Sequence, residues 1–293
     1  MKTKIQNDLL MLTYGGSLLY GTNHPESDVD LRGVQLDPIE TLLGFQSFEQ
    51  QNFSEFRWGK IFSDDVTIYG LRKFLRLAMD ANPNIIELLF AKPLYQSEDW
   101  EMIQELRFDI LSTKIVHSFS GYALSQLKRI KIRDEWTKNP PMKPNPYKYG
   151  MIDTDSGGQD WVSSSAKNTY NSKLLNYQNY SKWLNERNPK RRALEEKYGY
   201  DTKHAAHLYR LVFEAEELLT TGSLELPLKY ADNIKNVLNG CVSYEHVLEF
   251  ADSSLQHLKD LEKTSVLAKK PNRKSVEDWL IRYYTSLIVH GVI

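Results

Sequence analysis

Two short motifs near the N-terminus have the residue types that phosphate and metal chemistry requires. The first is Gly15-Gly16-Ser17, which follows the apolar run Leu9–Tyr14. Small residues at a strand end let backbone N–H groups approach a phosphate closely. The second is Asp28-Val29-Asp30-Leu31, after a spacer of ten residues. Aspartates at i and i+2 on a strand point to one face, where their oxygens can hold hard divalent cations. Together the motifs indicate chemistry on a nucleoside triphosphate.

The simplest alternative is a glycine turn followed by an Asp-rich loop. That interpretation does not explain why Val29 and Leu31 alternate with the two carboxylates, as they would on a strand with one buried face. A Walker P-loop is excluded, because no Gly-Lys-Ser/Thr follows the glycines.

The spacing of the two motifs resembles that of the DNA polymerase β superfamily of nucleotidyltransferases. The signature of these enzymes is Gly-Gly or Gly-Ser, a short spacer, and then Asp-hydrophobic-Asp/Glu-hydrophobic. Gly16, Ser17, Asp28 and Asp30 occupy the matching positions. The resemblance implies that Gly16 and Ser17 position the β- and γ-phosphates. It also implies that Asp28 and Asp30 hold two Mg²⁺ ions, with Mn²⁺ as the alternative metal.

Two-metal phosphoryl transfer normally uses a third carboxylate on a later strand. The candidates are Asp64, Asp65 and Glu87. If Val66 and Ile68 face the core, strand alternation directs Asp65 to the catalytic face and Asp64 away from it. Glu87 follows Asn82-Pro83 near a helix start, where a structural role is the alternative. We therefore predict Asp65 as the third metal ligand and as the group that helps to deprotonate an acceptor hydroxyl.

A second group of polar residues lies on a predicted helix from the N-cap Asp201 to a residue before Gly222. Its apolar residues form one stripe. Lys203, His207 and Arg210 share another face and could reach one anion together. Taken alone, that face favours the simpler interpretation of a solvated surface with i, i+4 ion pairs.

The chain also resembles one branch of the superfamily, the RlaP-type predicted nucleotidyltransferases of phages and bacteria, which gene neighbourhood links to RNA repair. In that light Lys203, His204, His207 and Arg210 are predicted to bind the triphosphate or the phosphate of the acceptor. The matching segments cover most of the chain outside residues 137–165, and beyond the first two motifs they are Leu71–Phe74, Asn82–Phe90, Gly121–Ala123 with Gln126, Asp201–Arg210 and Thr221–Leu224.

The bulk composition is that of an ordinary globular protein. The 293 residues are 41% hydrophobic and 26% charged, with a net charge of −1, which excludes a global basic field for coating nucleic acid. A single cysteine, Cys241, excludes an internal disulfide and a cysteine metal cluster. The first residues lack a signal-peptide core, and no apolar run approaches the roughly 18 residues of a membrane span. We expect a cytoplasmic protein of a bacterium or a phage-infected host, with no membrane partner.

The predicted fold class is mixed α+β. Residues 1–105 are predicted to form a polymerase-β-type nucleotidyltransferase domain with a mixed β-sheet. Residues 106–293 are predicted to form a mainly helical C-terminal domain, with a long proline- and glycine-rich loop at 137–165 and the active site in the cleft between the domains. Strands are expected at 9–14, 28–36, 53–61 and 66–69, and helices at 71–78, from 83, 112–131, from 167, 201–221, 230–238, 244–263 and 275–290.

The C-terminal half of the sequence contains two basic segments. Aromatic residues of 170–183 precede the run Arg187–Arg192, which fits stacking against single-stranded RNA or an apolar helix stripe followed by a solvated basic turn. The run Lys269–Lys274 is expected to be a solvated linker. Lys114 and His117, on the helix after Ser112, either face the cleft or lie on the solvated surface.

The sequence thus predicts a Mg²⁺-dependent enzyme that transfers a nucleoside monophosphate from a nucleoside triphosphate to a hydroxyl and releases pyrophosphate. The expected acceptor is an RNA, most plausibly the 3′ end of a tRNA. One alternative is nucleotidylation of a protein hydroxyl. Another is a non-catalytic module that binds nucleotide or RNA.

Overall fold

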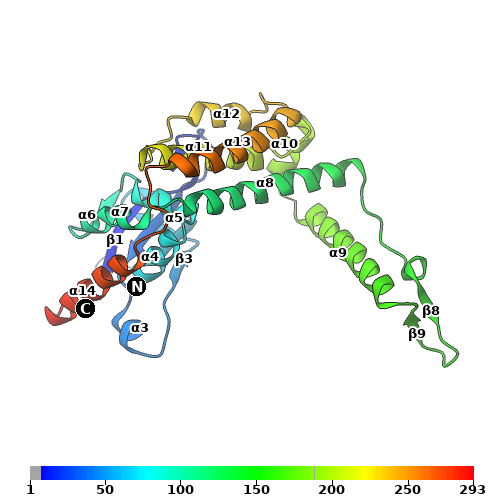
Figure 1. Ribbon diagram of the computed structural model, residues 1–293, viewed down its shortest axis with the longest axis horizontal. Coiled ribbons are helices and arrows are strands. Elements are labelled where there is room, and N and C mark those ends of the chain that lie inside the picture. The colour runs from blue at the N-terminus through cyan, green and yellow to red at the C-terminus, as the bar shows by residue number, and fades with distance from the viewer. Residues whose placement is uncertain (1–7, 188) are drawn as a thin grey trace. The chain divides into compact units, whose positions relative to one another are not determined.

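The structure is a computed structural model that describes residues 8–187 and 189–293. It divides into two compact units. One contains the described residues up to Ser125 together with Ala206–Ile293, and the other is Gln126–Ala205. The boundaries fall within the long helices α8 (Lys114–Lys138) and α11 (Thr202–Thr221) (Figure 1). Helices and a small mixed sheet together make the protein α+β, as the sequence predicts.

The first unit is built on a five-stranded sheet of order β3-β6-β2-β1-β7. Strand β2 pairs antiparallel with β1 and parallel with β6, while the outer strands β3 and β7 pair antiparallel with their neighbours. The sheet is therefore mixed. The strands are β1 (Leu9–Tyr14), β2 (Asp30–Gln35), β3 (Gln50–Phe53), β6 (Asp65–Gly70) and β7 (Tyr95–Gln96).

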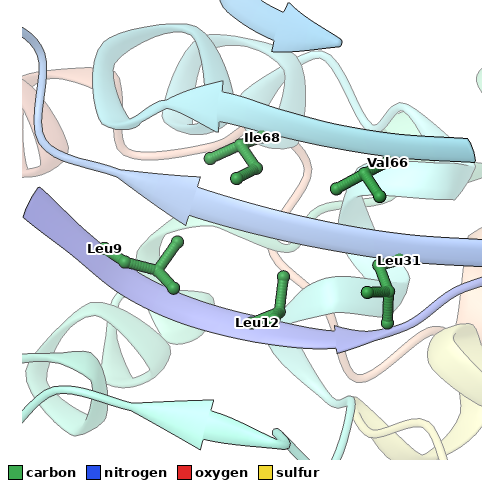
Figure 2. Packing of buried hydrophobic residues seen from close by; sticks show 5 residues of the cluster. All are labelled: Leu9, Leu12, Leu31, Val66 and Ile68. Carbon is green, nitrogen blue, oxygen red and sulfur yellow. The ribbon is translucent and has the colours of Figure 1, made fainter. Parts of the chain in front are cut away.

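Apolar residues from three neighbouring strands form the core on one face of the sheet. Leu9 and Leu12 of β1, Leu31 of β2, and Val66 and Ile68 of β6 are fully buried together (Figure 2). Leu9 and Leu12 share this face despite their odd spacing, because the register shifts between residues 9 and 11, as at a β-bulge. Burial of Val66 and Ile68 confirms the alternation predicted for this strand.

Residues 53–61 differ from the prediction of one strand. The chain instead ends β3 at Phe53 and forms a separate hairpin of β4 (Phe56–Trp58) and β5 (Ile61–Ser63). Gly59 lies between these strands with φ +59°, a left-handed conformation that allows the tight reversal. Strand β7 was not predicted, since its two residues are too short to produce a periodic pattern.

Helices complete the first unit, and most lie close to their predicted bounds. They include α2 (Gly16–Tyr20), α4 (Leu71–Met79), and α5 (Pro83–Ile86), which continues as the 3₁₀ turn η1 (Glu87–Leu89). Leu71, Phe74, Leu75 and Ala78 of α4 are all buried, as the i, i+3, i+4, i+7 spacing predicts. The remaining helices are α3 (Ile39–Leu43), α6 (Trp100–Glu105), α7 (Arg107–Ile110), α12 (Ala231–Leu238), α13 (Tyr244–Thr264) and α14 (Arg273–Val289).

The second unit consists of the later part of α8, a hairpin, two further helices and the first residues of α11 (Figure 1). Residues 137–165 were predicted as a long loop, and that prediction is wrong in part. They contain the 3₁₀ turn η2 (Pro146–Tyr149) and the hairpin of β8 (Met151–Asp153) and β9 (Gln159–Trp161). Helices α9 (Ser164–Glu186) and α10 (Pro189–Tyr198) follow.

Trp136, Tyr180 and Trp183 pack together in the second unit. Arg187 stacks over Trp183 and pairs with Glu195, and Arg192 pairs with Glu196. These contacts favour the structural interpretation of the aromatic and basic segment, because both the rings and the described arginines have partners within the unit. None of the helices in the described part of the chain is long and apolar enough to cross a membrane.

Candidate active site

The predicted catalytic residues gather at one edge of the sheet in the first unit. Strand β1 ends at Tyr14, which pairs with Leu31 of β2, and β2 begins at Asp30, directly opposite Asp65 at the start of β6. Since β1 runs against β2 and β6 runs with it, the end of one strand meets the beginnings of the other two. This register places the glycine turn beside Asp30 and Asp65.

The glycine turn lies in contact with the Asp30 segment. The backbone N–H of Gly15 donates to the carbonyl oxygen of Asp30 at 2.9 Å. Gly16 has φ +55°, and a Cβ atom at this position would overlap Oδ2 of Asp30. Both the backbone conformation and the close approach therefore require glycine here. Ser17 follows in the first turn of α2 and is half-buried.

Carboxylates crowd around Asp30. Burial raises the pKa of the Asp30 carboxyl, Arg32 opposes this shift, and Asp65 and then Asp28 add to it. Asp28 lies before β2, so the prediction that both aspartates lie on the strand holds only for Asp30. Carboxylate oxygens are the donors that a hard divalent cation prefers, and a bound cation would relieve the like-charge repulsion around Asp30. Asp28, Asp30 and Asp65 are the residues that could hold it.

Arg32 is a site residue that the sequence analysis missed. Its guanidinium forms a two-pronged pair with the Asp65 carboxylate, with Nη1 to Oδ1 at 3.2 Å and Nη2 to Oδ2 at 3.1 Å. No group of three or more His, Cys, Asp or Glu side chains among the described residues converges as a metal-ligand set. The signal was present in the sequence, because Arg32 is at i+2 from Asp30 and so shares its face of β2.

Ser63 is a second residue that the sequence analysis missed. Its buried hydroxyl donates to the carbonyl oxygen of Val29 at 2.5 Å and accepts from the backbone N–H of Asp65 at 3.3 Å. The hydroxyl thereby joins the segment before β2 to the start of β6. It fixes the two chain segments that present the carboxylates.

Arg210 lies in a buried network rather than on an open anion-binding face. Its guanidinium pairs with Glu87 and, at 3.1 Å, with Glu214, and it stacks over the ring of Tyr20. The Tyr20 hydroxyl donates to Oε2 of Glu87 at 2.8 Å. Burial raises the pKa of Glu214, and the Arg210 charge opposes this shift. Since Tyr20 is the last residue of α2, the network fixes the end of the helix that follows the glycine turn.

The position of Glu87 bears on the choice of third carboxylate. Glu87 is 2% exposed and is occupied by Arg210 and Tyr20, whereas Asp65 lies in register with Asp30. The structural role considered for Glu87 is therefore the one its contacts support. Asp64 is exposed and lies before the first residue of β6.

His204 belongs to a different network, within the unit Gln126–Ala205. Its Nδ1 lies 2.7 Å from Oε1 of Gln126, and its Nε2 lies 3.1 Å from a guanidinium nitrogen of Arg191. These partners fit a neutral ring that donates from Nδ1 and accepts at Nε2. Burial lowers the pKa of His204 to about 4, although the Asp201 charge opposes this shift.

The helix that carries these residues is otherwise as predicted. Asp201 caps α11 through its Oδ1, which accepts from the backbone N–H of His204 at 3.0 Å. Lys203 is exposed and His207 is half-buried. The structure thus places His204 and Arg210 in two separate buried networks and does not gather the four predicted phosphate ligands on one open face. Their predicted role in binding phosphate stays a prediction.

The sequence of this chain is similar to those of several known proteins. The chain is 29% identical over 141 residues to an uncharacterised 38.9 kDa protein of Enterobacteria phage T4, covering 45% of this chain and 40% of the phage protein. It is 30% identical over 118 residues to an uncharacterised protein of Methanocaldococcus jannaschii, covering 39% of this chain and 46% of the archaeal protein. The matched regions thus span less than half the length of each curated relative.

A crystal structure of a nucleotidyltransferase-like protein from Exiguobacterium sibiricum is also similar, at 11% identity and a TM-score of 0.28, over 90% of this chain and 73% of that one. The low TM-score means that this similarity supports no argument about the site. The family match is far more extensive, since residues 1–265 match RlaP, described as the RNA repair pathway DNA polymerase beta family. The chain therefore belongs to the RlaP family of DNA polymerase β-type proteins of RNA repair.

Proposed function

We propose that this protein is a Mg²⁺-dependent nucleotidyltransferase that transfers a nucleoside monophosphate from a nucleoside triphosphate to a hydroxyl of an RNA. The observation that carries the proposal is the apposition of Gly16 to Asp30, with Asp65 in register beside them. An RNA acceptor is favoured by membership of an RNA repair family. We expect the 3′ end of a tRNA as the first acceptor to test, and the cytoplasm as the place of action.

Each residue at the sheet edge has a task in this proposal. Backbone N–H groups of the Gly16-Ser17 turn approach the β- and γ-phosphates, which the absence of a Cβ at Gly16 allows. Asp28, Asp30 and Asp65 are the residues that would hold Mg²⁺, and the ion would supply charge neutralisation of the triphosphate. Arg32 orients the Asp65 carboxylate through its two-pronged pair.

The proposed transfer is a displacement at phosphorus. The acceptor oxygen forms a bond to the α-phosphorus, the bond from that phosphorus to the bridging oxygen breaks, and pyrophosphate leaves with the electron pair. The Asp65 carboxylate, which is 61% exposed, accepts the proton of the acceptor hydroxyl. The protein's contribution is positioning and charge neutralisation.

The first experiment is a transfer assay with each α-labelled nucleoside triphosphate, Mg²⁺ and total cellular RNA. We expect the wild type to label one RNA size class. Asp28→Ala/Asp30→Ala should lower the rate by roughly 10²-fold or more, since electrostatic positioning is lost. Asp64→Ala is the matched control, because it removes an exposed carboxylate beside β6, and it should retain near wild-type activity.

Three results would contradict the proposal in different ways. Transfer that survives Asp28→Ala/Asp30→Ala at the wild-type rate would remove these carboxylates from the chemistry. Label on a protein instead of RNA would identify a protein hydroxyl as the acceptor. Nucleotide binding without label transfer or pyrophosphate release would identify a non-catalytic binding module.

A further inference from the structure

The first unit contains a cavity of about 420 Å³ that shares no residue with the carboxylate edge of the sheet. Three segments line it: the start of α8, one position on α13, and the connection that leads into α14. The lining residues are Thr113, Lys114, His117, Glu262, Lys269, Lys270, Pro271 and Arg273.

Positive charge exceeds negative charge around this cavity. Lys114, Lys269, Lys270 and Arg273 contribute four cationic groups, and Glu262 is the one carboxylate among the lining residues. Asp80 pairs with Lys114 at 2.7 Å and with Arg273 at 2.6 Å. No carboxylate within the described part of the chain pairs with Lys269 or Lys270.

The segment that presents Lys269 and Lys270 is an exposed connection between α13 and α14, as the prediction of a solvated linker requires, and its backbone is also fixed at both ends. The carbonyl oxygen of Ala268 accepts from the backbone N–H of Thr113 at 2.8 Å. On the other side of the two lysines, Asn272 donates its backbone N–H to the carbonyl oxygen of Asp109 at 2.7 Å and its side-chain amide to Oδ1 of Asp109 at 3.0 Å. Both ends of the basic segment are therefore attached to the helical elements around α7 and α8.

Such an arrangement is suited to a phosphate group. The cations stand on a fixed backbone, so binding would require little ordering of the chain. Asp80 pairs with Lys114 and Arg273 and so orients them. It does not pair with Lys269 or Lys270, which can therefore contact an anion. The net charge of the whole protein is −1, so the positive charge here is local rather than part of a general basic surface. A cavity of this volume can admit a group of nucleotide size.

We propose that this cavity binds a backbone phosphate of the RNA acceptor, outside the site of transfer. The proposal rests on the proposed function, because the RNA repair family and the transfer reaction identify RNA as the phosphate-bearing partner. It assigns the lysine pair Lys269 and Lys270 to phosphate contact. Lys114 and Arg273 complete the positive lining.

The test measures RNA binding rather than transfer. A short fluorescently labelled single-stranded RNA is titrated with full-length wild type and with Lys269→Gln/Lys270→Gln, by anisotropy at several salt concentrations and without nucleotide. Loss of this phosphate contact should weaken binding by about tenfold and reduce the slope of log K against log salt by about 0.7. The matched control is Lys235→Gln/Lys259→Gln, which removes the same charge from a half-buried position on α12 and an exposed position on α13, and it should change affinity by less than about twofold.

A second variant tests whether RNA affinity rises when a negative charge is removed from the cavity. Glu262→Gln removes the carboxylate that lines the cavity and should tighten RNA binding by about two- to threefold, since an anion no longer repels the phosphate. Equal losses in both lysine pairs, or no loss in Lys269→Gln/Lys270→Gln, would overturn the proposal. So would loss of labelled nucleoside triphosphate binding with RNA binding unchanged, which would assign the cavity to free nucleotide.

The two proposals fail in different assays. If the wild type binds RNA through the lysine pair but transfers no label, the proposed function is overturned and the cavity assignment stands. If label transfer occurs while the lysine pair has no effect on RNA affinity, the cavity assignment is overturned and the proposed function stands. A wild type that binds no RNA in this assay would overturn the cavity assignment as well.

Discussion

Gly16 and Asp30 constrain one another at the scale of single residues. The glycine has a left-handed backbone, and its missing side chain leaves the space in which the Asp30 carboxylate lies. Asp30 in turn has a raised pKa, chiefly because it is partly buried, with the nearby Asp65 carboxylate adding to the shift. Gly16 is required for two reasons: its left-handed φ and the lack of space for a Cβ atom beside Asp30. An experiment can separate these reasons, because another glycine of the chain has the left-handed φ but space for a Cβ atom.

We predict that Gly16→Ala and Gly59→Ala lower stability alike, while only Gly16→Ala impairs the site. Both positions have a φ near +55° to +59°, so alanine should cost about 1–2 kcal/mol at each, as measured by urea unfolding. A Cβ at Gly59 meets nothing within 4 Å, whereas one at Gly16 displaces the Asp30 carboxylate. Label transfer by Gly16→Ala should fall roughly 10²-fold. Equal transfer activity in the two variants would contradict the assigned role of Asp30.

At the scale of elements, α2 is attached to the rest of the first unit at its last residue. Tyr20 ends this five-residue helix and contacts both Glu87 of η1 and Arg210 of α11. A helix this short has little stability of its own, so tertiary contacts must hold it in place. The buried network is therefore expected to position the glycine turn indirectly, without touching substrate.

We predict that Arg210→Met lowers the free energy of unfolding by about 3–5 kcal/mol, because Glu87 and Glu214 would stay buried without their cation. Part of this loss should be recovered as the pH is lowered, because burial raises the pKa of Glu214 and its unpaired carboxylate then takes up a proton. Urea unfolding between neutral and mildly acidic pH measures both effects. Lys263→Ala, which breaks an exposed pair with Asp260, is the control and should leave the free energy of unfolding nearly unchanged, without acid recovery.

At the scale of the whole molecule, the two units place their buried charges in different environments. In the unit Gln126–Ala205, Asp201 pairs with Arg133 and Arg191 and caps the start of α11. His204 lies in the same cluster and has its pKa lowered from 6.5 to about 4, mainly by burial. The acid response of this unit should therefore depend on His204.

We predict that the second unit loses stability as the pH falls from about 6.5 to about 4. The unfolded chain protonates His204 near 6.5, but the folded unit does not until about 4, so the unfolded state binds more protons in this window. His204→Gln should flatten this pH dependence, measured by urea unfolding with tryptophan fluorescence. This variant retains both Glu195 and Asp201. The raised pKa of Glu195 changes stability with pH in the direction opposite to the lowered pKa of His204. His246→Gln, at an exposed position, is the control, and an unchanged slope in His204→Gln would contradict the assignment.

The local sequence pattern alone determined several secondary-structure elements and the family motif of this protein. The apolar run before the glycines, the alternation in β6 and the capped stripe of α11 were all predictable, because each depends on neighbours within a few residues. The motif Gly16-Ser17 with Asp28 and Asp30 likewise indicated the family that residues 1–265 match. Spacing along one strand and one turn suffices for these features.

Only the tertiary structure decided which charged side chains meet. The sequence pattern left Arg210 with either an anion or a solvated helix face, and the structure pairs it with Glu87, 123 positions away. Arg32 meets Asp65 because two strands lie in parallel register, and Lys269 and Lys270 stand on a backbone fixed by Asp109 and Thr113. Such partners come from elements far apart in the chain, so no local periodicity encodes them. Burial then sets the charge of each group, because desolvation depends on what packs around it.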